Sequence, residues 1–318
     1  MTNEPMDEDD ILRALEARLG RLHARQRLGI ERDHEAQVFG QGLNFFHPEN
    51  LAASPLLVRA ALTAVGLYRR GLANAEKVVL RENRLVSAKL PHAFDGFAIL
   101  HLSDLHADMC PKAMARVRSL VDDISCDLCV LTGDYRGATH GPYEATLAAM
   151  AELREAIRAP ILAVLGNHDT ILMAPGLERM GMRVLLNERE RILRAGARIH
   201  VAGIDDAHYF RVDNIEKAGE GIPNGEFSIL LSHTPEIYRQ AAHAGFDALL
   251  AGHTHGGQIC LPGGVALTLD SVLPRAFGAG AWRYHDMQGY TSVGAGSSVL
   301  PVRFNCPPEI TLHRLRTA

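Results

Sequence analysis

The chain has 318 residues, of which 47% are hydrophobic, so it is long and apolar enough to build a sizeable core. Its formal net charge of -4 and its pI near 6.5 argue against a general nucleic-acid-binding protein, which would usually be basic, and we expect no nucleic-acid partner. The five cysteines have no framework-like spacing, which argues against a disulfide-built secreted domain and favours a reducing compartment.

Residues 1–75 predict a helical extension that carries no catalytic motif. The first ten residues are acidic and no positively charged leader precedes an apolar run, so we expect no secretory signal. Residues 11–32 place leucines on one side and arginines elsewhere at helical spacing, which predicts an amphipathic helix. Such a helix suits an anionic membrane surface, and it also suits packing on its own domain or on a partner subunit; both readings stay open.

A loop over residues 40–50 is followed by a second predicted helix over residues 51–72. Its most apolar part, residues 51–68, is broken by Pro55 and carries Arg59 centrally. A charge in the middle of a bilayer costs several kcal/mol, so this segment is a poor membrane-spanning helix. It remains a candidate for lying on a membrane surface.

Residues 76–318 predict one domain in which strands alternate with helices. Helical patterns occur at 114–123 and 143–158, and strand-like runs occur at 77–80, 85–90, 97–102, 128–132, 161–165, 184–186, 199–204, 229–231 and 248–251. From residue 258 on, glycine, proline and β-branched residues indicate strands and turns. The alternation predicts an α/β fold in which helices cover sheets.

Five of the strand-like runs end in polar side chains of one chemical character. Asp104 and His106 follow the run at 97–102, and side chains two apart in an extended chain leave the same face, so both can point at one spot. The other exits carry Asp134, Asn167-His168-Asp169, His233, and the pair His253 and His255. Singly, these are a turn, a cap and surface residues, but ligands collect beyond the carboxyl ends of strands, so together they predict one site.

Seven of these residues offer imidazole, carboxylate or amide donors: Asp104, His106, Asp134, Asn167, His233, His253 and His255. Seven donors exceed the three or four protein ligands of a single catalytic ion and suit two divalent ions that share one carboxylate. A donor set without thiolate favours manganese, with iron and zinc as alternatives. Two adjacent ions can acidify a bridging water and clamp a phosphoryl oxygen, which predicts hydrolysis of a phosphate ester by a metal-bridging hydroxide.

Several histidines lie between the third and the last of these exits, and His233 is the predicted ligand because it alone directly ends an apolar strand. His208 follows two aspartates and is the second candidate, with a place in the substrate pocket as its expected role. His200 falls within a strand and His243 within a helix, so structural roles are expected for both.

The motifs at these exits resemble, in order and at plausible spacing, those of the calcineurin-like metallophosphoesterase superfamily: Asp104-x-His106, Gly133-Asp134, Gly166-Asn-His-Asp169, His233 and Gly252-His-x-His255. The resemblance covers roughly residues 90–315 and implies a four-layer α/β/β/α sandwich of two mixed β-sheets. It divides the donors between two ions, with Asp104, His106 and His255 on the first, Asn167, His233 and His253 on the second, and Asp134 bridging them.

The resemblance also implies catalytic roles next to the ligands. His168 would protonate the leaving oxygen or steady the charge on the phosphoryl group, and Asp169 would orient its imidazole. One position departs from the family pattern, because a further aspartate that many members carry after the Gly-Asp pair is absent from the run Asp134-Tyr-Arg-Gly137. Tyr135 or Arg136 would then support the bridging ligand or orient the substrate.

The C-terminal part is similar to a bacterial branch of membrane-linked phosphohydrolases, which includes enzymes that cleave the pyrophosphate of UDP-2,3-diacylglucosamine in lipid A synthesis. The similarity lies in residues 252–259, 294–296 and 301–310. It implies a lipid-linked or nucleotide-linked substrate and a cytoplasmic protein, free or peripheral to the inner membrane. Gly256 and Gly257 would let the substrate approach the ions, and Arg303 would contact a phosphate or pair with Glu309.

Two other functions compete with this prediction. A cyclic-nucleotide phosphodiesterase or a nuclease would use the same donors, although the acidic pI counts against a nuclease. A catalytically silent, metal-stabilised binding module would keep the fold without the chemistry, and retention of all seven donors together with His168 counts against it.

Overall fold

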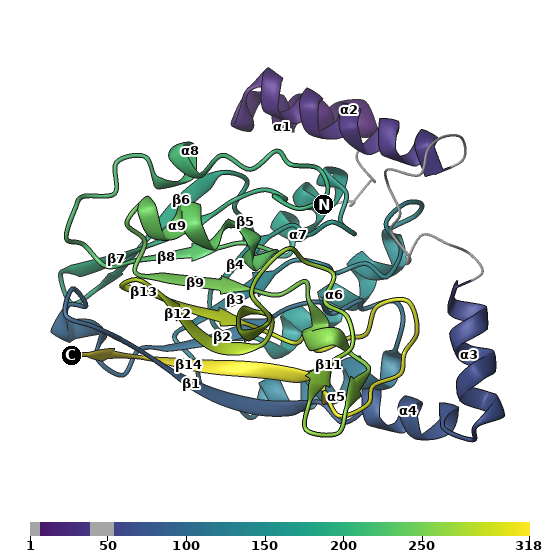
Figure 1. The fold of residues 1–318 in the computed structure, drawn as a ribbon. Helices are drawn as coiled ribbons and strands as arrows, with labels where there is room; N and C mark the ends of the chain where they lie inside the picture. Colours follow the sequence, from purple (N-terminus) through teal and green to yellow (C-terminus); the bar gives the residue numbers. More distant parts are fainter. Residues whose placement is uncertain (1–6, 39–53) are drawn as a thin grey trace.

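Two six-stranded mixed β-sheets form the centre of the protein in the computed structural model, which describes residues 7–38 and 54–318 (Figure 1). The first sheet has the order β1 (Val79–Ser87), β14 (Glu309–Thr317), β2 (Ala98–Leu102), β3 (Leu128–Thr132), β4 (Ile161–Val164), β5 (Met182–Val184). The second has the order β12 (Gly280–Tyr284), β13 (Met287–Thr291), β9 (Ala248–Ala251), β8 (Ser228–Leu231), β7 (Ala197–Gly203), β6 (Glu188–Arg194).

Alternating side chains of the buried strands sort into separate core layers, as the period of a strand requires. On β2, Leu100 and Leu102 face a cluster shared with the helices of the first sheet, whereas Ile99 faces a cluster between the two sheets. The first sheet is covered by α5 (Pro111–Asp122), α6 (Glu144–Ala156) and α7 (Ala174–Arg179), and the second by α8 (Ile215–Gly219) and α9 (Tyr238–His243). The predicted four-layer α/β/β/α sandwich of two mixed sheets is confirmed.

Two edge strands differ from the predicted elements. Residues 77–80 and 85–90 do not form two short strands. The single strand β1 runs through residues 79–87 and pairs with β14, and residues 88–90 form a turn. Likewise β6 was missed, although it pairs with β7 along seven residues. Both strands are rich in Arg and Glu because an edge strand exposes most of its side chains, so the apolar run that signals a buried strand is absent.

The predicted helix over residues 11–32 is two helices, α1 (Glu8–Leu19) and α2 (Arg21–Val38), separated at Gly20. Gly20 has φ 90° and its N–H bonds the carbonyl of Glu16, which ends α1. The apolar stripe of the two helices is buried in the same cluster as the helices of the first sheet, through Ile11, Leu15, Leu19, Ala24 and Leu28. Of the two readings of this segment, packing on its own domain is the one observed.

The second predicted helix, over residues 51–72, is also two helices, α3 (Ser54–Ala64) and α4 (Tyr68–Ala75), with Gly66 at φ 73° between them. Residues 51–53 and the predicted loop at 40–50 lie outside the described residues. Gly71 of α4 packs against Val302 and Phe304, where a Cβ would come within 3 Å of both side chains. Within the described ranges, no helix combines the length and the apolar character needed to cross a bilayer.

Candidate metal centre

The predicted donors come from five strand ends that meet at one edge of the sandwich. β2, β3 and β4 are parallel neighbours in the first sheet, and β8 and β9 are parallel neighbours in the second, so their carboxyl ends point the same way. The donor atoms form two groups, each lying within 4.8 Å: Asp104, His106 and His255, and Asp134, His233 and His253. The structure therefore brings together residues that are up to 151 positions apart in the chain.

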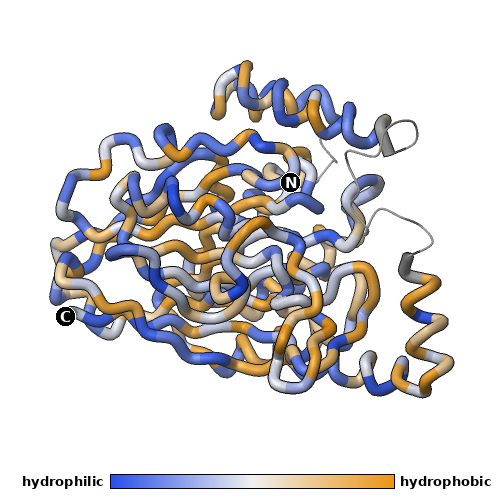
Figure 2. The backbone as a smooth tube through the Cα atoms, in the orientation of Figure 1, coloured by the Kyte–Doolittle hydropathy of each residue, from blue (hydrophilic) through white to orange (hydrophobic). Residues whose placement is uncertain are grey.

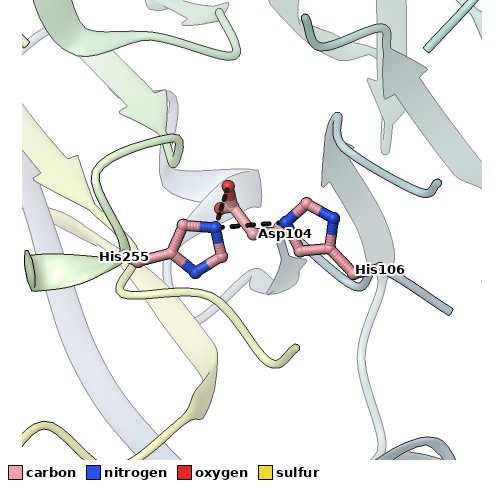
Figure 3. Close-up of side chains that lie close together, drawn as sticks. All are labelled: Asp104, His106 and His255. Carbon is pink, nitrogen blue, oxygen red and sulfur yellow. Dashed lines mark hydrogen bonds and ion pairs between the residues drawn. The ribbon is translucent and has the colours of Figure 1, made fainter. Parts of the chain in front are cut away.

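The first group joins the exit of β2 to the loop after β9 (Figure 3). Nε2 of His106 lies 3.1 Å from Nε2 of His255, which in turn lies 3.5 Å from Oδ1 of Asp104. All three residues are buried. Two ring nitrogens and a carboxylate oxygen thus face one point from three sides.

The second group joins the exits of β3, β8 and β9, and Asn167, after β4, lies beside it. Nε2 of His233 lies 3.3 Å from Oδ2 of Asp134, 2.9 Å from Oδ1 of Asn167 and 3.2 Å from Nδ1 of His253. Oδ2 of Asp134 is also 3.9 Å from Nε2 of His106. Asp134 thus reaches both groups, which is the placement expected of a shared carboxylate.

Backbone carbonyls fix which ring nitrogen of two histidines faces each group. Nδ1 of His106 lies 2.8 Å from the carbonyl of Arg136, and Nδ1 of His233 lies 2.8 Å from the carbonyl of Thr132. A carbonyl can only accept, so Nδ1 carries a proton in both rings and Nε2 is the nitrogen that faces the donor group. This is the arrangement that orients histidine ligands in metal sites.

Five of the donors have left-handed backbone: φ is 50° at Asp104, 39° at His106, 55° at Asp134, 71° at His253 and 49° at His255. This conformation is costly for residues other than glycine and concentrates at functional sites. A glycine precedes the donors at three of the strand exits, at positions 133, 166 and 252. Only Gly133 has a positive φ, and Gly166 and Gly252 are instead required by close approach.

The tightest of these approaches is at Gly252, where a Cβ would lie 1.8 Å from Oγ of Ser103 and 2.3 Å from Oδ2 of Asp104. A Cβ at Gly166 would lie 2.2 Å from Oδ1 of Asp134. Any side chain at either position would displace a carboxylate of the site. The glycines therefore make room for the donors.

Burial and mutual interaction shift the pKa values of the donors strongly. Burial raises the pKa of Asp104 to about 6. Burial also acts to lower the pKa of His233, but the neighbouring Asp134 carboxylate outweighs it and raises the pKa to about 10. In turn, burial acts to raise the pKa of Asp134, but the neighbouring His233 and His168 outweigh it and hold the pKa well below its usual value. Two buried carboxylates and four imidazoles that converge on two points fit divalent cations, which would compensate the buried charge.

His168 lies beside the donors, with Nε2 3.9 Å from Oδ2 of Asp134. Its Nδ1 lies 3.3 Å from the hydroxyl of Thr139, a residue that sequence analysis missed because nothing distinguishes a loop threonine. The expected role of Asp169 differs from the observed one. Its carboxylate accepts backbone N–H groups of the loop that carries Asp134, and so it orients that loop and not the His168 ring.

Arg136 and Arg303, which we expected to contact the substrate, are buried and hold backbone carbonyls instead. Arg136 donates to the carbonyls of His168 at 2.7 Å, Gly141 at 2.6 Å and Thr139 at 2.5 Å. Arg303 donates to the carbonyls of residues 293 and 296 at 2.7 and 2.6 Å, and its Nη2 lies 3.2 Å from Nδ1 of His255. Its expected alternative partner, Glu309, accepts a hydrogen bond from Tyr290 at 3.0 Å.

Tyr135 does not take the place of the missing aspartate, because its side chain is buried away from the donors with its hydroxyl donating to the carbonyl of Val164 at 2.6 Å. Gly256 and Gly257 are required by packing. A Cβ at Gly256 would lie 2.6 Å from the Val293 side chain, and one at Gly257 would lie 2.6 Å from Ala266. Close packing therefore accounts for glycine at these two positions, where we had expected room for the substrate.

His208 lies next to the second group, with its ring centroid 4.2 Å from that of His253 and its Nδ1 2.8 Å from Glu236. With Asp270 and His253 it forms a third set of donor atoms within 4.8 Å. That set shares His253, and a ring that binds one ion through Nδ1 keeps a proton on Nε2, so we do not count a third ion site. Away from the site, His200 pairs with Glu226 at 2.6 Å, as a structural residue would.

The comparison with known families agrees with this geometry. The model of the calcineurin-like phosphoesterase family matches residues 97–257, which contain all seven donors. The chain belongs to the calcineurin-like phosphoesterase family. It is therefore a metal-dependent phosphoesterase, since members of this family are hydrolases that use divalent metals.

Similar proteins come from several bacteria. The uncharacterized metallophosphoesterase YkoQ of Bacillus subtilis is 33% identical over 68% of this chain and 83% of its own length. Its YkuE counterpart in the same organism is 30% identical over 82% of this chain and 94% of its own length. The phosphodiesterase YaeI of Escherichia coli is 28% identical over 69% of this chain and 82% of its own length.

Proposed function

We propose that the protein hydrolyses phosphoric ester or pyrophosphate bonds with two divalent cations, and that a phosphodiester is its preferred substrate. The proposal is carried by one observation: two groups of donor atoms converge side by side, and Oδ2 of Asp134 faces donors of both. A single ion would use half of this set. The name of the relative YaeI, a phosphodiesterase, supports the preference for a diester.

The donors would be divided as the family resemblance implies, with Asp104, His106 and His255 on one ion, Asn167, His233 and His253 on the other, and Asp134 shared. Bound divalent cations supply Lewis-acid activation of water and of the phosphoryl group. Manganese is the favoured metal because imidazole, carboxylate and amide donors suit it, with iron and zinc as alternatives.

His168 is the proposed proton donor to the leaving oxygen. Its ring stands beside Asp134 without belonging to either donor group, and the ring centroids of His168 and His106 are 5.2 Å apart. A positioned general acid contributes about 10²- to 10⁴-fold to a rate. His208, at the opposite group, is proposed as a residue of the substrate pocket, since its ring packs on that of His253.

The test is turnover of bis(4-nitrophenyl) phosphate by the full chain with manganese, together with the metal content of each variant. We expect wild type to be active and His168→Ala to lose about 10²-fold in turnover while keeping its metal. His243→Ala, an exposed histidine of α9, is the matched control and should be unchanged.

Each alternative predicts a different result in this assay. Loss of metal in His168→Ala would place that residue among the ligands. A wild type that binds metal stoichiometrically and turns over neither diesters, monoesters nor pyrophosphates would favour the silent binding module. A strong preference for cyclic nucleotides over aryl diesters and nucleotide-linked pyrophosphates would favour the cyclic-nucleotide phosphodiesterase. The lipid-linked, UDP-diacylglucosamine-like substrate rests on the C-terminal resemblance and would appear as a preference for amphiphilic pyrophosphates.

We also propose that α3 binds an anionic membrane surface. Its apolar side chains face solvent, with Leu56 and Leu57 at 65% and 70% exposure, and Val65, which directly follows α3, is 67% exposed. Figure 2 shows this apolar helix standing apart from the sheets. Residues 54–75 contain Arg59, Arg69 and Arg70 and no acidic residue, in a chain whose net charge is -4. Exposed apolar residues together with cations suit an anionic lipid interface.

The length of α3 indicates how it would bind. Its 11 residues extend about 16 Å, roughly half of a hydrocarbon core, so the helix would lie in the interface and not cross it. The membrane role that the sequence suggested for residues 11–32 moves to α3, because the stripe of α1 and α2 is buried in the core.

Co-sedimentation with vesicles tests this proposal. We expect the full chain to sediment with vesicles that contain phosphatidylglycerol and not with vesicles of phosphatidylcholine alone. The double substitution Leu56→Ser and Leu57→Ser should abolish sedimentation. Leu193→Ser, which removes a leucine of β6 at 73% exposure, is the matched control. Equal sedimentation of the double variant and wild type would refute the proposal.

A further inference from the structure

α2 carries a buried polar stripe that its amphipathic pattern did not reveal. His23, Arg27 and Glu31 are spaced by four residues and lie on the face that meets the domain. Arg27 has no exposed surface and Glu31 is 8% exposed. Arg27 is one of the arginines that lie outside the leucine side of the predicted helix over residues 11–32, yet it is fully buried.

The stripe holds the loop that follows His168. Nη2 of Arg27 donates to the carbonyl of Asp169 at 2.7 Å. The carboxylate of Glu31 accepts the hydroxyl of Thr170 at 2.6 Å and the N–H of Ile171 at 2.8 Å. Arg136 donates to the carbonyl of His168 itself at 2.7 Å. The backbone that follows Cα of His168 is therefore fixed by buried charged groups.

The same stripe holds the loop on the other side of the donors. Nε2 of His23 lies 2.8 Å from Oδ2 of Asp205, and Nε of Arg27 lies 3.6 Å from Oδ1 of Asp205. The guanidinium carbon of Arg27 stands 3.4 Å over the ring of Phe210. This loop carries His208 beside the second donor group. α2 thus connects the loops of His168 and His208.

Packing alone does not require these charges. Ala24 and Leu28 already seat α2 in the core. A buried guanidinium between two carboxylates contributes little net stability compared with apolar residues of similar size, because desolvation offsets the attraction. What such a network can supply is a fixed geometry. Here that geometry concerns the loop next to Asp134.

We propose that Arg27 and Glu31 are positioning residues: they hold residues 168–171 so that the His168 imidazole stands where the leaving oxygen departs. The inference rests on the proposed role of His168 as proton donor. In this proposal α2 supports the site by holding the loop of His168, although it contributes no donor to either group. Displacement of a catalytic group by about 1 Å can cost up to about 10²-fold in rate.

Two aryl phosphodiesters of different leaving-group quality test the proposal. Proton donation matters most when the leaving group is poor, so diphenyl phosphate should be affected more than bis(4-nitrophenyl) phosphate. We expect Arg27→Met to lower kcat about 10-fold on diphenyl phosphate and much less on the nitrophenyl ester, with unchanged metal content. Arg27→Lys keeps the charge and one donor, and should recover part of this loss.

A double-mutant cycle separates positioning from general destabilisation. If Arg27 acts through His168, then the variant with both His168→Ala and Arg27→Met should be no slower than His168→Ala alone. The matched control is Arg18→Met: Arg18 ties α1 to Glu178 at 2.6 Å and also contacts Glu188, away from the His168 loop. Its kcat should stay within about 2-fold of wild type on both esters, as expected for a contact remote from the site.

The outcomes distinguish failure of the positioning role from failure of the proposed function. Losses that multiply in the double variant, or equal losses in Arg27→Met and Arg18→Met, would overturn the positioning role and leave the proposed function intact. An inactive wild type, or a His168→Ala variant without leaving-group dependence, would refute the proposed chemistry and this inference with it. If Arg27→Met fails to fold, Glu31→Gln carries the same comparison, because it weakens the grip on Thr170 and Ile171 while keeping the side-chain shape.

Discussion

The buried carboxylate of Asp169 holds the backbone of two loops that carry donors of the site. Its two oxygens accept the N–H groups of Asp134 at 2.8 Å, Tyr135 at 2.9 Å and Gly166 at 2.9 Å. These are the segments from which the carboxylate of Asp134 and the amide of Asn167 emerge. A buried carboxylate that satisfies several backbone donors sets the shape of both loops at once.

We expect Asp169→Asn to weaken manganese affinity or turnover about 10- to 100-fold, the usual effect of losing an outer-shell partner. The substituted amide presents an NH₂ group to backbone N–H donors that need an acceptor. Metal titration and kcat on bis(4-nitrophenyl) phosphate measure the effect. Asp108→Asn is the control, because Asp108 also accepts a backbone N–H, from Gly137 at 2.7 Å, but is exposed. Wild-type affinity in Asp169→Asn would contradict the assignment.

The positions of the donors were predictable at the scale of single residues, whereas the partners of the buried polar groups were not. Asp104, Asp134 and His233 each follow an apolar run, and the geometry of parallel strands alone brings such positions together. The partners of Arg136 and Arg303 are carbonyls of loops whose path is set by tertiary packing. No local pattern distinguishes an arginine that holds carbonyls from one that binds a phosphate.

At the scale of elements, two glycines of the N-terminal helices have opposite requirements. Gly20 ends α1 with φ 90°, a conformation that alanine tolerates poorly. Gly29 lies exposed within α2, and a Cβ there would meet nothing within 4 Å. Periodicity alone does not show that the helix breaks at Gly20 and continues through Gly29. For that reason the single helix predicted over residues 11–32 joined two helices.

We predict that Gly29→Ala raises the free energy of unfolding by about 0.5–1 kcal/mol, because alanine has the higher helix propensity and restricts the unfolded chain. Gly20→Ala should lower the free energy of unfolding by a similar or larger amount, because it forces a left-handed residue with a side chain. Thermal melts of both variants and wild type, followed by circular dichroism under one set of conditions, check the pair. A melting temperature that moves in the same direction in both variants would contradict the assigned helix end.

Buried strands were well predicted and edge strands were not, and the reason is physical. β3 and β9 match the predicted ranges because neighbours cover both faces and select apolar side chains throughout. In β6, five of seven residues are Arg or Glu. Pairing with β7 defines that strand through its backbone, and backbone pairing leaves little trace in the sequence.

For the molecule as a whole, family and fold followed from motif order, whereas the role of the N-terminal helices did not. An apolar stripe with flanking arginines has the same pattern whether it meets lipid or protein. Only the three-dimensional position shows that Ile11, Leu15 and Leu28 join the core and that Leu56 and Leu57 do not. The N-terminal helices therefore divide into α1 and α2, which pack on the sheet domain, and α3, whose leucines face solvent.

The metal centre should also contribute to the stability of the whole molecule. Asp134 belongs to a loop of the first sheet and His233 and His253 to loops of the second, so cations bound there would join the two halves of the sandwich. A ligand that binds only the folded state stabilises it by about 2.7 kcal/mol at a hundred times its dissociation constant. We therefore expect the melting temperature to rise with added manganese and to fall after chelation with EDTA.

The design of the chelation experiment distinguishes site binding from a general salt effect. Asp134→Ala should lose most of the manganese-dependent rise, because it removes the carboxylate that faces both donor groups. Arg18→Met should keep the rise, since Arg18 lies in the N-terminal contact and holds no donor. An equal rise in all three proteins would place the stabilising ions elsewhere on the surface. A manganese-dependent rise in melting temperature that occurs in wild type and not in Asp134→Ala would show that ions bound at this centre stabilise the contact between the two sheets.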